Sequence, residues 1–545
     1  MAKHSFIIVI LCTLLSTTAT AEMEPSPTDS LELTAPGSEL RDDSVCDLPQ
    51  LESESDEYVF EHIPHEQEPF ACRFLEAAPT VLTWPATPLS KTFEWLLHAE
   101  HVTLKTELDE APIGMQQVTE RPELLFEWNE QFLKAGFLNQ GTTLPTGAVW
   151  RPSLWIFGQY RTAYQYQDAT IRNRRVSEWA NRLDLFGQVN LSGTERLLVG
   201  IRPLDEEIRN RRVFSGYDFY NDRSVDGWNG DVQTLFFEGD FGEIFPCLDI
   251  NDSRWLDWGF SVGRMPLLAQ QGLLINEDLL DAVTLTRNTI YGDDLLNLRM
   301  TGVYAWSGIN RNSPTNQPND YDPTSRMVAL LTERDFQHTT VNLDAVYVYG
   351  NDLVTGDLLT FGVSAIQRHY GYHNTYNSSL HVLGSYPTQG VTPYADQGIL
   401  LFGQTSWTPH HTYDLVYVNT FWAIDQFTSP ARGPLQGGPL GQTGLLFAGT
   451  QLGQFAAPLA VRTDDIAGAS LGYQLFFNGT RDQVVCEVGG YRETKSRGRD
   501  AAIGTMVRYQ KAIGHRMVGI VDGSVTKRES TNVTPGARAE LLIKF

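Results

Sequence analysis

The chain has 545 residues, and its 66 acidic and 41 basic side chains give a formal net charge of −25. This acidic balance argues against nucleic acid as a partner, because a polyanion would be repelled. After the first 21 residues, no stretch approaches the roughly 20 consecutive apolar residues that a membrane-spanning helix needs. The composition therefore argues against a helical membrane protein as well.

The first 21 residues predict a secretory signal peptide. Lys3 supplies the positive start, an apolar run extends from Phe6 to Leu15, and small residues at Ala19 to Ala21 provide a cleavage site. The next segment, 22–70, carries 15 acidic residues up to position 69 against a single basic one, Arg41. Its low content of aliphatic residues predicts a disordered acidic arm.

Residues 71–149 have a different sequence pattern, and we expect a partly helical periplasmic segment here. Two stretches have amphipathic helical patterns, 90–108 and 122–135, and Gly136 would end the second one.

From about residue 150 to the end, segments of about ten residues alternate between apolar and polar side chains. Ile156, Tyr160 and Tyr164, for example, oppose Gln159 and Arg161. The same pattern predicts 18 strands, near 154–166, 182–191, 195–202, 232–239, 256–264, 282–288, 295–306, 326–333, 340–350, 358–367, 375–385, 398–408, 412–423, 470–478, 482–491, 501–510, 515–525 and 537–545.

Long and short links alternate between these predicted strands, with one clear exception at 240–255. Such alternation is typical of an up-and-down antiparallel β-barrel in a membrane, with tight turns at one end and long loops at the other. We therefore predict an all-β transmembrane barrel over 150–545. A barrel of 16 to 18 strands is wide enough for an aqueous channel.

The last nine residues, ARAELLIKF, alternate strictly apart from Leu542 and end on the aromatic Phe545. A barrel must pair its last strand with its first to satisfy all backbone groups in lipid. This ending resembles the C-terminal signal of bacterial outer-membrane barrels. The resemblance implies that outer-membrane lipid and the barrel-insertion machinery are partners, and that the protein is located in the bacterial outer membrane.

The inward positions show a strong bias in the choice of cation, since residues 131–545 contain 30 Arg but only 5 Lys. Arg offers a planar fork that suits carboxylate and phosphate groups. The alternation turns a ladder of arginines away from lipid, namely Arg161, Arg182, Arg196, Arg202, Arg299, Arg508 and Arg538. Inward counter-charges are predicted at Asp184, Asp344 and Glu540. Either this ladder attracts an anion through weak repeated sites, or the charges only pair with each other and stiffen the wall.

Strict alternation would place Arg264 on the lipid face, where a charge at mid-membrane costs roughly 2–4 kcal/mol. We expect a strand end or a bulge at Gly263 to bring it to the lumen or the rim. The longest link, 424–469, is rich in Gly and Pro. It is predicted to be either an inward-folded constriction or an external loop.

Over residues 150–545 the chain resembles the alginate-export family of outer-membrane porins. The resemblance rests on the number of strands, the arginine ladder, the terminal ARAELLIKF and the segments FSVGRMPLL (260–268) and GGPLGQTGLLF (437–447). It implies an 18-stranded barrel that passes an acidic polysaccharide or a smaller anion. The acidic arm and residues 71–149 are not part of that pattern.

Two other classes of function stay open at this stage. An outer-membrane barrel enzyme is one, although the sequence has no Gly-x-Ser-x-Gly elbow. A secreted soluble β-protein that binds carbohydrate through exposed aromatic residues is the other. No pattern in the sequence predicts a metal site or another cofactor, and we expect a channel rather than an enzyme.

Overall fold

The computed structural model describes residues 123–545, except 135, 169–174, 209–210, 252–253, 293–294, 314–319, 322, 351–354, 371–374, 410–411, 436–442, 497 and 499. The predicted signal peptide, the acidic arm and the predicted helix at 90–108 lie outside the described residues.

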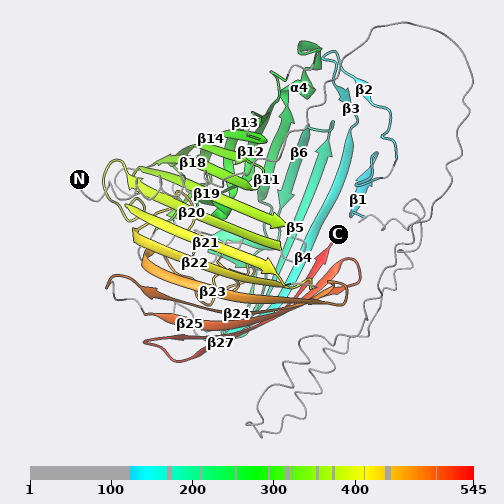
Figure 1. The fold of residues 1–545 in the computed structure, drawn as a ribbon. Helices are drawn as coiled ribbons and strands as arrows, with labels where there is room; N and C mark the ends of the chain where they lie inside the picture. Colours follow the sequence, from blue (N-terminus) through cyan, green and yellow to red (C-terminus); the bar gives the residue numbers. More distant parts are fainter. Residues whose placement is uncertain are drawn as a thin grey trace, which may run out of the picture. The chain divides into compact units, whose positions relative to one another are not determined.

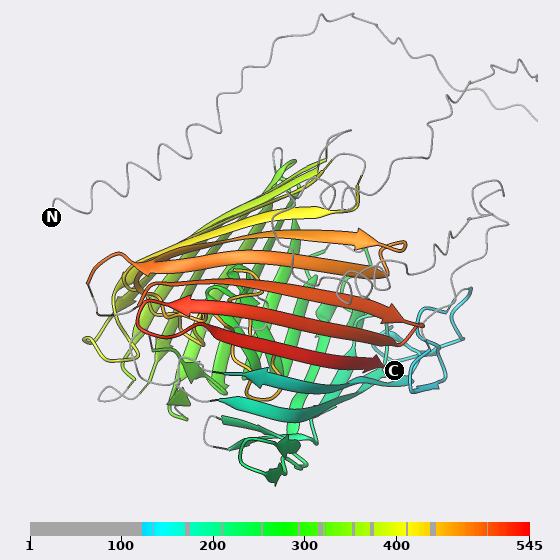
Figure 2. The ribbon, with the colours of Figure 1, turned by 90° about the horizontal axis from the view of Figure 1, so that it is seen from below.

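The described chain forms a closed antiparallel β-barrel of 18 wall strands (Figures 1 and 2). The wall consists of β4 (Ser153–Gln167), β5 (Val176–Asn190), β6 (Arg196–Ile201), β11 (Val232–Asp240), β12 (Trp258–Ala269), β13 (Ile275–Ile290), β14 (Asn297–Ser307), β17 (Arg326–Asp335), β18 (Thr339–Tyr349), β19 (Leu358–Tyr370), β20 (Thr375–Pro387), β21 (Gly398–Thr408), β22 (Leu415–Gln426), β23 (Asp464–Phe477), β24 (Asp482–Glu493), β25 (Ala502–Ile513), β26 (Met517–Arg528) and β27 (Thr534–Lys544). Each of the 18 predicted strands coincides with one of them, which confirms the predicted fold class.

The barrel closes where β27 pairs with β4, from Gly536 opposite Gln167 to Lys544 opposite Gln159. Phe545 extends this pairing, since its carbonyl accepts from the Gly158 nitrogen at 2.7 Å and its nitrogen donates to the Gly158 carbonyl at 3.0 Å. Figure 2 shows the red C-terminal strand beside the cyan first wall strand. Because the last strand lies on the first, the ladder of backbone hydrogen bonds is continuous around the wall.

The rest of the β4 edge is covered by β1 (Phe126–Trp128), which pairs with it from Phe126 opposite Ile156 to Trp128 opposite Leu154. The prediction of a helix over 122–135 is therefore wrong for its described part. The sequence is amphipathic here, but a short isolated helix is only marginally stable. The free edge of β4 offers backbone hydrogen bonds to the same residues, and they pair with it as a strand.

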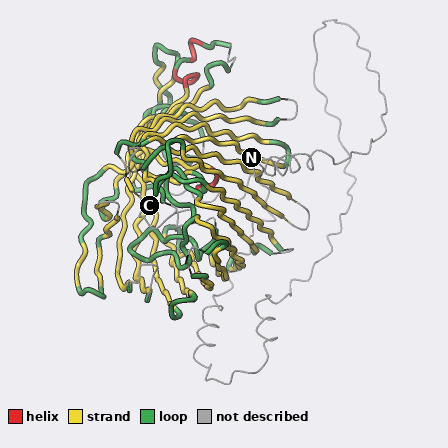
Figure 3. Tube along the Cα trace, turned by 90° about the vertical axis from the view of Figure 1, so that its left-hand side faces the viewer, coloured by secondary structure: helices red, strands yellow, loops and turns green. Residues whose placement is uncertain are grey.

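Short elements occupy the remaining described chain, and Figure 3 shows how little of it is helical. They are β2 (Thr142–Thr143), β3 (Val149–Trp150), β7 (Asp205–Ile208), β8 (Arg211–Phe214), β9 (Gly216–Asp218), β10 (Arg223–Val225), α4 (Phe241–Ile244), η2 (Pro246–Leu248), η3 (Gln270–Gly272), β15 (Asn310–Arg311) and β16 (Asp320–Tyr321). None of the described helices is both long and apolar enough to cross a membrane.

The links between wall strands follow the predicted alternation at most positions. Links 191–195, 336–338 and 514–516 are short, whereas 202–231 and 427–463 are long. We call the two ends of the barrel the short-link end and the long-link end.

Two links depart from this alternation. The predicted exception is present at 241–257, which holds α4 and η2. A second exception was not predicted, because β12 and β13 extend further than expected and leave only 270–274 between them.

The inner surface of the barrel is not uniformly polar. A buried apolar cluster lines the wall from β12 to β25, and Met327, Val346 and Phe402 each have 0% of their surface exposed. Leu446 and Leu459 of link 427–463 belong to the same cluster, so this link folds into the barrel. The barrel interior, which the number of strands predicted to be wide enough for an aqueous channel, is therefore filled by link side chains in this sector.

Candidate functional site

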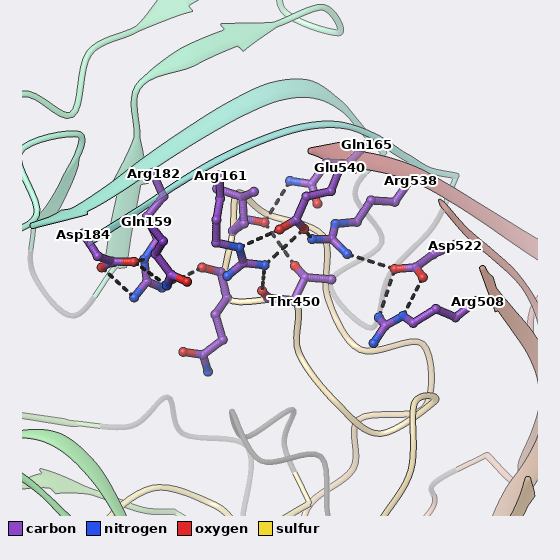
Figure 4. Close-up of polar contacts among 12 residues, drawn as sticks. Gln159, Arg161, Gln165, Arg182, Asp184, Thr450, Arg508, Asp522, Arg538 and Glu540 are labelled. Atoms are coloured by element: carbon purple, nitrogen blue, oxygen red, sulfur yellow. Dashed lines mark hydrogen bonds and ion pairs between the residues drawn. The ribbon is translucent and has the colours of Figure 1, made fainter. Parts of the chain in front are cut away.

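Charged side chains cross the inner wall as one continuous strip, which we call the charge belt. It runs over five adjacent strands, β5, β4, β27, β26 and β25, and so crosses the seam of the barrel, and it ends at Arg202 directly after β6. Its members are Arg202, Arg182, Asp184, Arg161, Glu540, Arg538, Asp522 and Arg508. Figure 4 labels all of them except Arg202.

Strand register explains why these side chains meet. Asp522 lies opposite Arg538 on one side and Arg508 on the other. Arg161 lies opposite Arg182. Because side chains opposite each other on one face of an antiparallel pair are about 5 Å apart, long side chains at these positions reach one another.

One half of the belt gathers around the carboxylate of Asp184, which is 1% exposed. Arg182 Nε donates to its Oδ2 at 3.0 Å, and Arg202 Nε donates to its Oδ1 at 2.8 Å. The amide of Gln159 donates to Oδ2 at 2.9 Å. A buried carboxylate in this position requires such partners, because an unpaired buried charge is very costly.

The other half is a chain of ion pairs (Figure 4). Arg161 Nε donates to Glu540 Oε1 at 2.6 Å, and Glu540 also contacts Arg538. Arg538 Nη1 donates to Asp522 Oδ2 at 2.9 Å, while Arg508 holds the same carboxylate with two bonds of 2.7 and 3.0 Å. The two-bond geometry is the strong form of this interaction.

Guanidinium groups outnumber carboxylates in the belt, since five of the former face three of the latter. Two further buried carboxylates, Asp205 and Glu487, act electrostatically on Arg182, Arg202 and Arg508. The predicted pairing of charges across strands therefore does occur, and the belt remains rich in hydrogen-bond donors that suit an anion.

Link 427–463 lies against the belt through its backbone. Arg161 Nη2 donates to the Thr450 carbonyl at 3.0 Å, and Arg182 Nη1 donates to the Gln451 carbonyl at 3.0 Å. Gln165 Nε2 donates to the Leu452 carbonyl at 2.8 Å. Of the two predicted possibilities for the longest link, the described part of the link is folded inward and is not an external loop.

A second anchor holds this link to β24, the strand next to the β25 end of the belt. Glu487 on β24 is 2% exposed, and its carboxylate accepts from the backbone nitrogens of Leu445 at 2.7 Å and Leu446 at 2.8 Å. The link is therefore fixed to β24 at one point and to β4 and β5 at another.

Link 202–231 adds an ion pair beside the belt. Asp205 on β7 is 2% exposed and accepts from Arg212 Nη1 at 2.9 Å. Burial raises the pKa of this carboxyl group above its ordinary value, although the nearby cations Arg212, Arg182 and Arg202 oppose the shift.

Two predicted arginines lie outside the belt, toward the short-link end. Arg196 at the start of β6 pairs with Glu238, and Arg299 near the start of β14 pairs with Glu333. About half of each arginine side chain is exposed, 53% and 51% respectively. These pairs are close to one mouth of the barrel, separated from the belt.

Arg264 is at the rim of the long-link end and not in the conduit. It alternates with the inward residue Met265, which is 6% exposed, and so shares the outward face of Val262. Gly263 has a φ of +128°, but the alternation continues through it. Two hydrogen bonds of 2.7 and 3.1 Å to Asp281 offset its charge, which explains how it is tolerated there.

Asp344 is also separate from the arginines. Its carboxylate accepts from Gln270 Nε2 at 2.8 Å and from the Thr332 nitrogen at 2.9 Å. Gln270 in turn contacts His381 Nδ1 at 2.9 Å. Asp344 therefore holds link 270–274 to the wall, and its predicted role as a counter-charge of the arginine ladder is wrong.

Sequence reasoning missed several residues of the site. Asp522 and Gln159 could have been found, because the alternation that points Arg538 and Arg161 inward applies to them too. Glu487 sits in an alternating strand as well, but nothing in the sequence links it to Leu445. Among the residues that the structure describes, no group of three or more His, Cys, Asp or Glu could hold a metal ion.

Comparisons with known proteins support the fold. No family model and no curated protein matches the chain. Among solved structures, OccK2 (OpdF) of Pseudomonas aeruginosa in complex with glucuronate is similar at a TM-score of 0.50 with 10% identity, covering 72% of this chain and 98% of that one. OccK9 (OpdG) of the same organism also gives 0.50, with 12% identity and the same coverage. At these identities the similarity establishes the barrel fold alone.

Proposed function

We propose that this chain is an outer-membrane channel through which anionic solutes diffuse along an arginine-lined inner wall. The observation that carries the proposal is the charge belt, in which five guanidinium groups outnumber three carboxylates on the inside of a closed barrel. The outer face supports the location, because outward side chains such as Val328, Leu380 and Val521 are apolar and about half exposed.

The chemistry of the belt favours a carboxylate-bearing solute. Each guanidinium group offers a planar fork that a carboxylate can accept in the two-bond geometry already seen between Arg508 and Asp522. A sugar acid is our first candidate, and the presence of glucuronate in the OccK2 complex supports it. Several forks in sequence would also fit the repeated carboxylates of an acidic polysaccharide, which is the second candidate.

Transport requires that the solute bind weakly, and the carboxylates of the belt weaken its binding by competing for the arginines. Glu540 and Asp522 occupy part of the donor capacity of Arg161, Arg538 and Arg508, so a passing anion meets competition at each step. Such sites attract an anion without holding it in a deep well.

The decisive experiment records single-channel conductance and reversal potential in planar bilayers with the purified full-length protein. We expect an anion-selective channel whose selectivity falls in Arg161→Gln and falls less in Arg299→Gln, because Arg299 is at a mouth and not in the belt. Arg492→Gln, on the outer face, is the matched control and should leave selectivity unchanged. A protein that inserts but does not conduct would instead support the barrel-enzyme alternative.

Competition assays then separate the two candidate cargoes. Glucuronate added to one side should reduce chloride current if sugar acids enter the belt, whereas a polyuronate chain should produce long blocking events. Extraction that requires detergent, together with heat-modifiable migration on a gel, would exclude the secreted soluble protein. We also propose that Phe545 is read by the barrel-insertion machinery, and that its deletion lowers the amount of inserted protein.

A further inference from the structure

Arg326 is on the outer face of the barrel and, unlike Arg264 at the same end, has no carboxylate partner among the residues that the structure describes. Arg326 is the first residue of β17 and follows link 308–325, so it lies at the long-link end. The next residue, Met327, is buried inside the barrel, and Val328 is 47% exposed on the outside. Because strand side chains alternate, Arg326 shares the outward face of Val328.

Aromatic side chains stand on both sides of Arg326. On β18, Tyr349 lies directly opposite it. On β14, Tyr304 lies opposite Val328, so the outward residue two positions further, Trp306, is beside Arg326.

These aromatic side chains form two contacting pairs. The rings of Tyr347 and Tyr349 stack at 5.9 Å between centroids, and those of Tyr304 and Trp306 lie 6.5 Å apart. Tyr and Trp are enriched where a membrane wall meets the headgroup layer, because each ring joins an apolar body to a polar tip. This cluster therefore marks the headgroup depth at the long-link end.

Two backbone carbonyls hold the guanidinium group of Arg326 in place. Its Nη1 donates to the carbonyls of Pro323 and Ser325, both at 2.9 Å. No carboxylate of the described chain pairs with it, and its Nε and Nη2 have no acceptor there. Arg264, at the same end of the barrel, differs because Asp281 accepts from its Nε and Nη2.

We propose that Arg326, framed by Trp306 and Tyr349, binds the phosphate group of a membrane lipid headgroup in the leaflet at the long-link end. The two carbonyl bonds fix one edge of the guanidinium group, and this leaves the Nε and Nη2 edge for two phosphate oxygens. The flanking rings would cover the sugar or acyl part of the same lipid. The proposal rests on the outer face meeting lipid, and it is independent of what passes through the channel.

The test measures binding of lipid A, a phosphorylated glycolipid, to the full-length protein in detergent by native mass spectrometry and by thermal unfolding. We expect lipid A to bind and to raise the unfolding midpoint. Arg326→Gln should weaken binding about tenfold or more, since it removes two hydrogen bonds between charged groups. Arg326→Lys should recover part of the loss, because it retains the charge without the fork.

The matched control is Arg492→Gln. Arg492 is exposed on the outward face of β24 near the long-link end, where it faces Ala467 rather than an aromatic ring. Equal weakening by both Gln variants, or no binding to the unaltered protein, would overturn the proposal. Equal stabilisation by inorganic phosphate would overturn the assignment to a lipid. An unchanged midpoint of Arg326→Gln without lipid A would show that the variant folds.

Discussion

Two sectors of the same barrel use the same alternation of side chains for opposite purposes. From β25 through the seam to β6, inward positions carry charges that pair with each other and with backbone carbonyls of link 427–463. From β12 to β25, many inward positions carry apolar side chains that form one cluster with the same link, and buried polar residues such as Asp344 and Glu487 lie between them. The comparison shows that the alternation of side chains predicts which residues point into the barrel. It does not predict whether those residues meet water or pack against a link.

The link itself joins the two sectors. Its backbone groups around Thr450 satisfy the arginines, while Leu446 and Leu459 fill the apolar side. One segment therefore meets both requirements, and the open part of the lumen is expected to lie along the charged sector. The first two predictions below each change one sector and leave the other in place, and the last two concern the links that lie against them.

The largest expected effect is the loss of packing in the apolar sector. Phe402 on β21 is fully buried and contacts the ring of His381. Phe402→Ala should lower the free energy of unfolding by about 3–5 kcal/mol, because it removes a large side chain and leaves a cavity. Urea unfolding in detergent would measure this, with ion selectivity unchanged. Phe361→Ala, at a position 48% exposed on the outer face, is the control and should cost much less.

Removal of one carboxylate tests the charged sector. Asp522→Asn leaves Arg538 and Arg508 without their shared partner, so we expect a loss of about 3 kcal/mol in unfolding free energy and a higher preference for anions. Reversal potentials measure the second effect. The double variant Asp522→Asn with Arg508→Gln restores the original net charge of the belt, and its selectivity should return toward that of the unaltered protein. If the reversal potential were the same in the unaltered protein and both variants, ions would not pass along the belt.

A smaller effect is expected at the anchor between the sectors. Glu487→Gln replaces a charged acceptor by a neutral one for the nitrogens of Leu445 and Leu446, which should cost about 1–2 kcal/mol. The link should then leave the wall more often, and single-channel recordings should show more frequent changes in current. Cys486→Ser changes the adjacent outward residue and should leave the recordings as they were.

The smallest expected effect concerns pH. The raised pKa of Asp205 means that this carboxyl group takes up a proton at a higher pH than an ordinary aspartate does. As pH falls through that value the neighbourhood of the belt loses a negative charge, and the preference for anions should rise. Asp205→Asn should already show the higher preference at neutral pH, with a weaker dependence on pH. An identical pH profile in both proteins would contradict this.

The sequence predicted the wall and the direction of most charged side chains, because alternation is local. Arg161, Arg182, Arg202, Arg508 and Arg538, with Asp184 and Glu540, could be placed inward in this way. The bond from Arg161 to Thr450 joins positions 289 apart, and no local pattern encodes such a contact. For the same reason, neither the packed sector nor the contact of Asp344 with Gln270 could be predicted.

Arg264 shows a second limit. Because a charge on the lipid face is costly, a strand end or a bulge was expected to bring Arg264 to the lumen or the rim. Instead, Arg264 remains on the outer face at the rim, where Asp281 on the next strand pairs with it. The helix expected over 122–135 shows a third limit. Phe126–Trp128 is a strand because it pairs with the free edge of β4, which is distant in the sequence.

That edge has a consequence for topology. Phe545 bonds to Gly158, and the pairing of β1 with β4 begins only two residues away at Ile156. β1 and β27 thus pair with successive parts of the same edge of β4. A circular permutant that fused residue 545 to residue 123 and opened a tight turn such as 514–516 would retain every wall pairing, whereas truncation before Val149 would leave β4 with an uncovered stretch open to another chain.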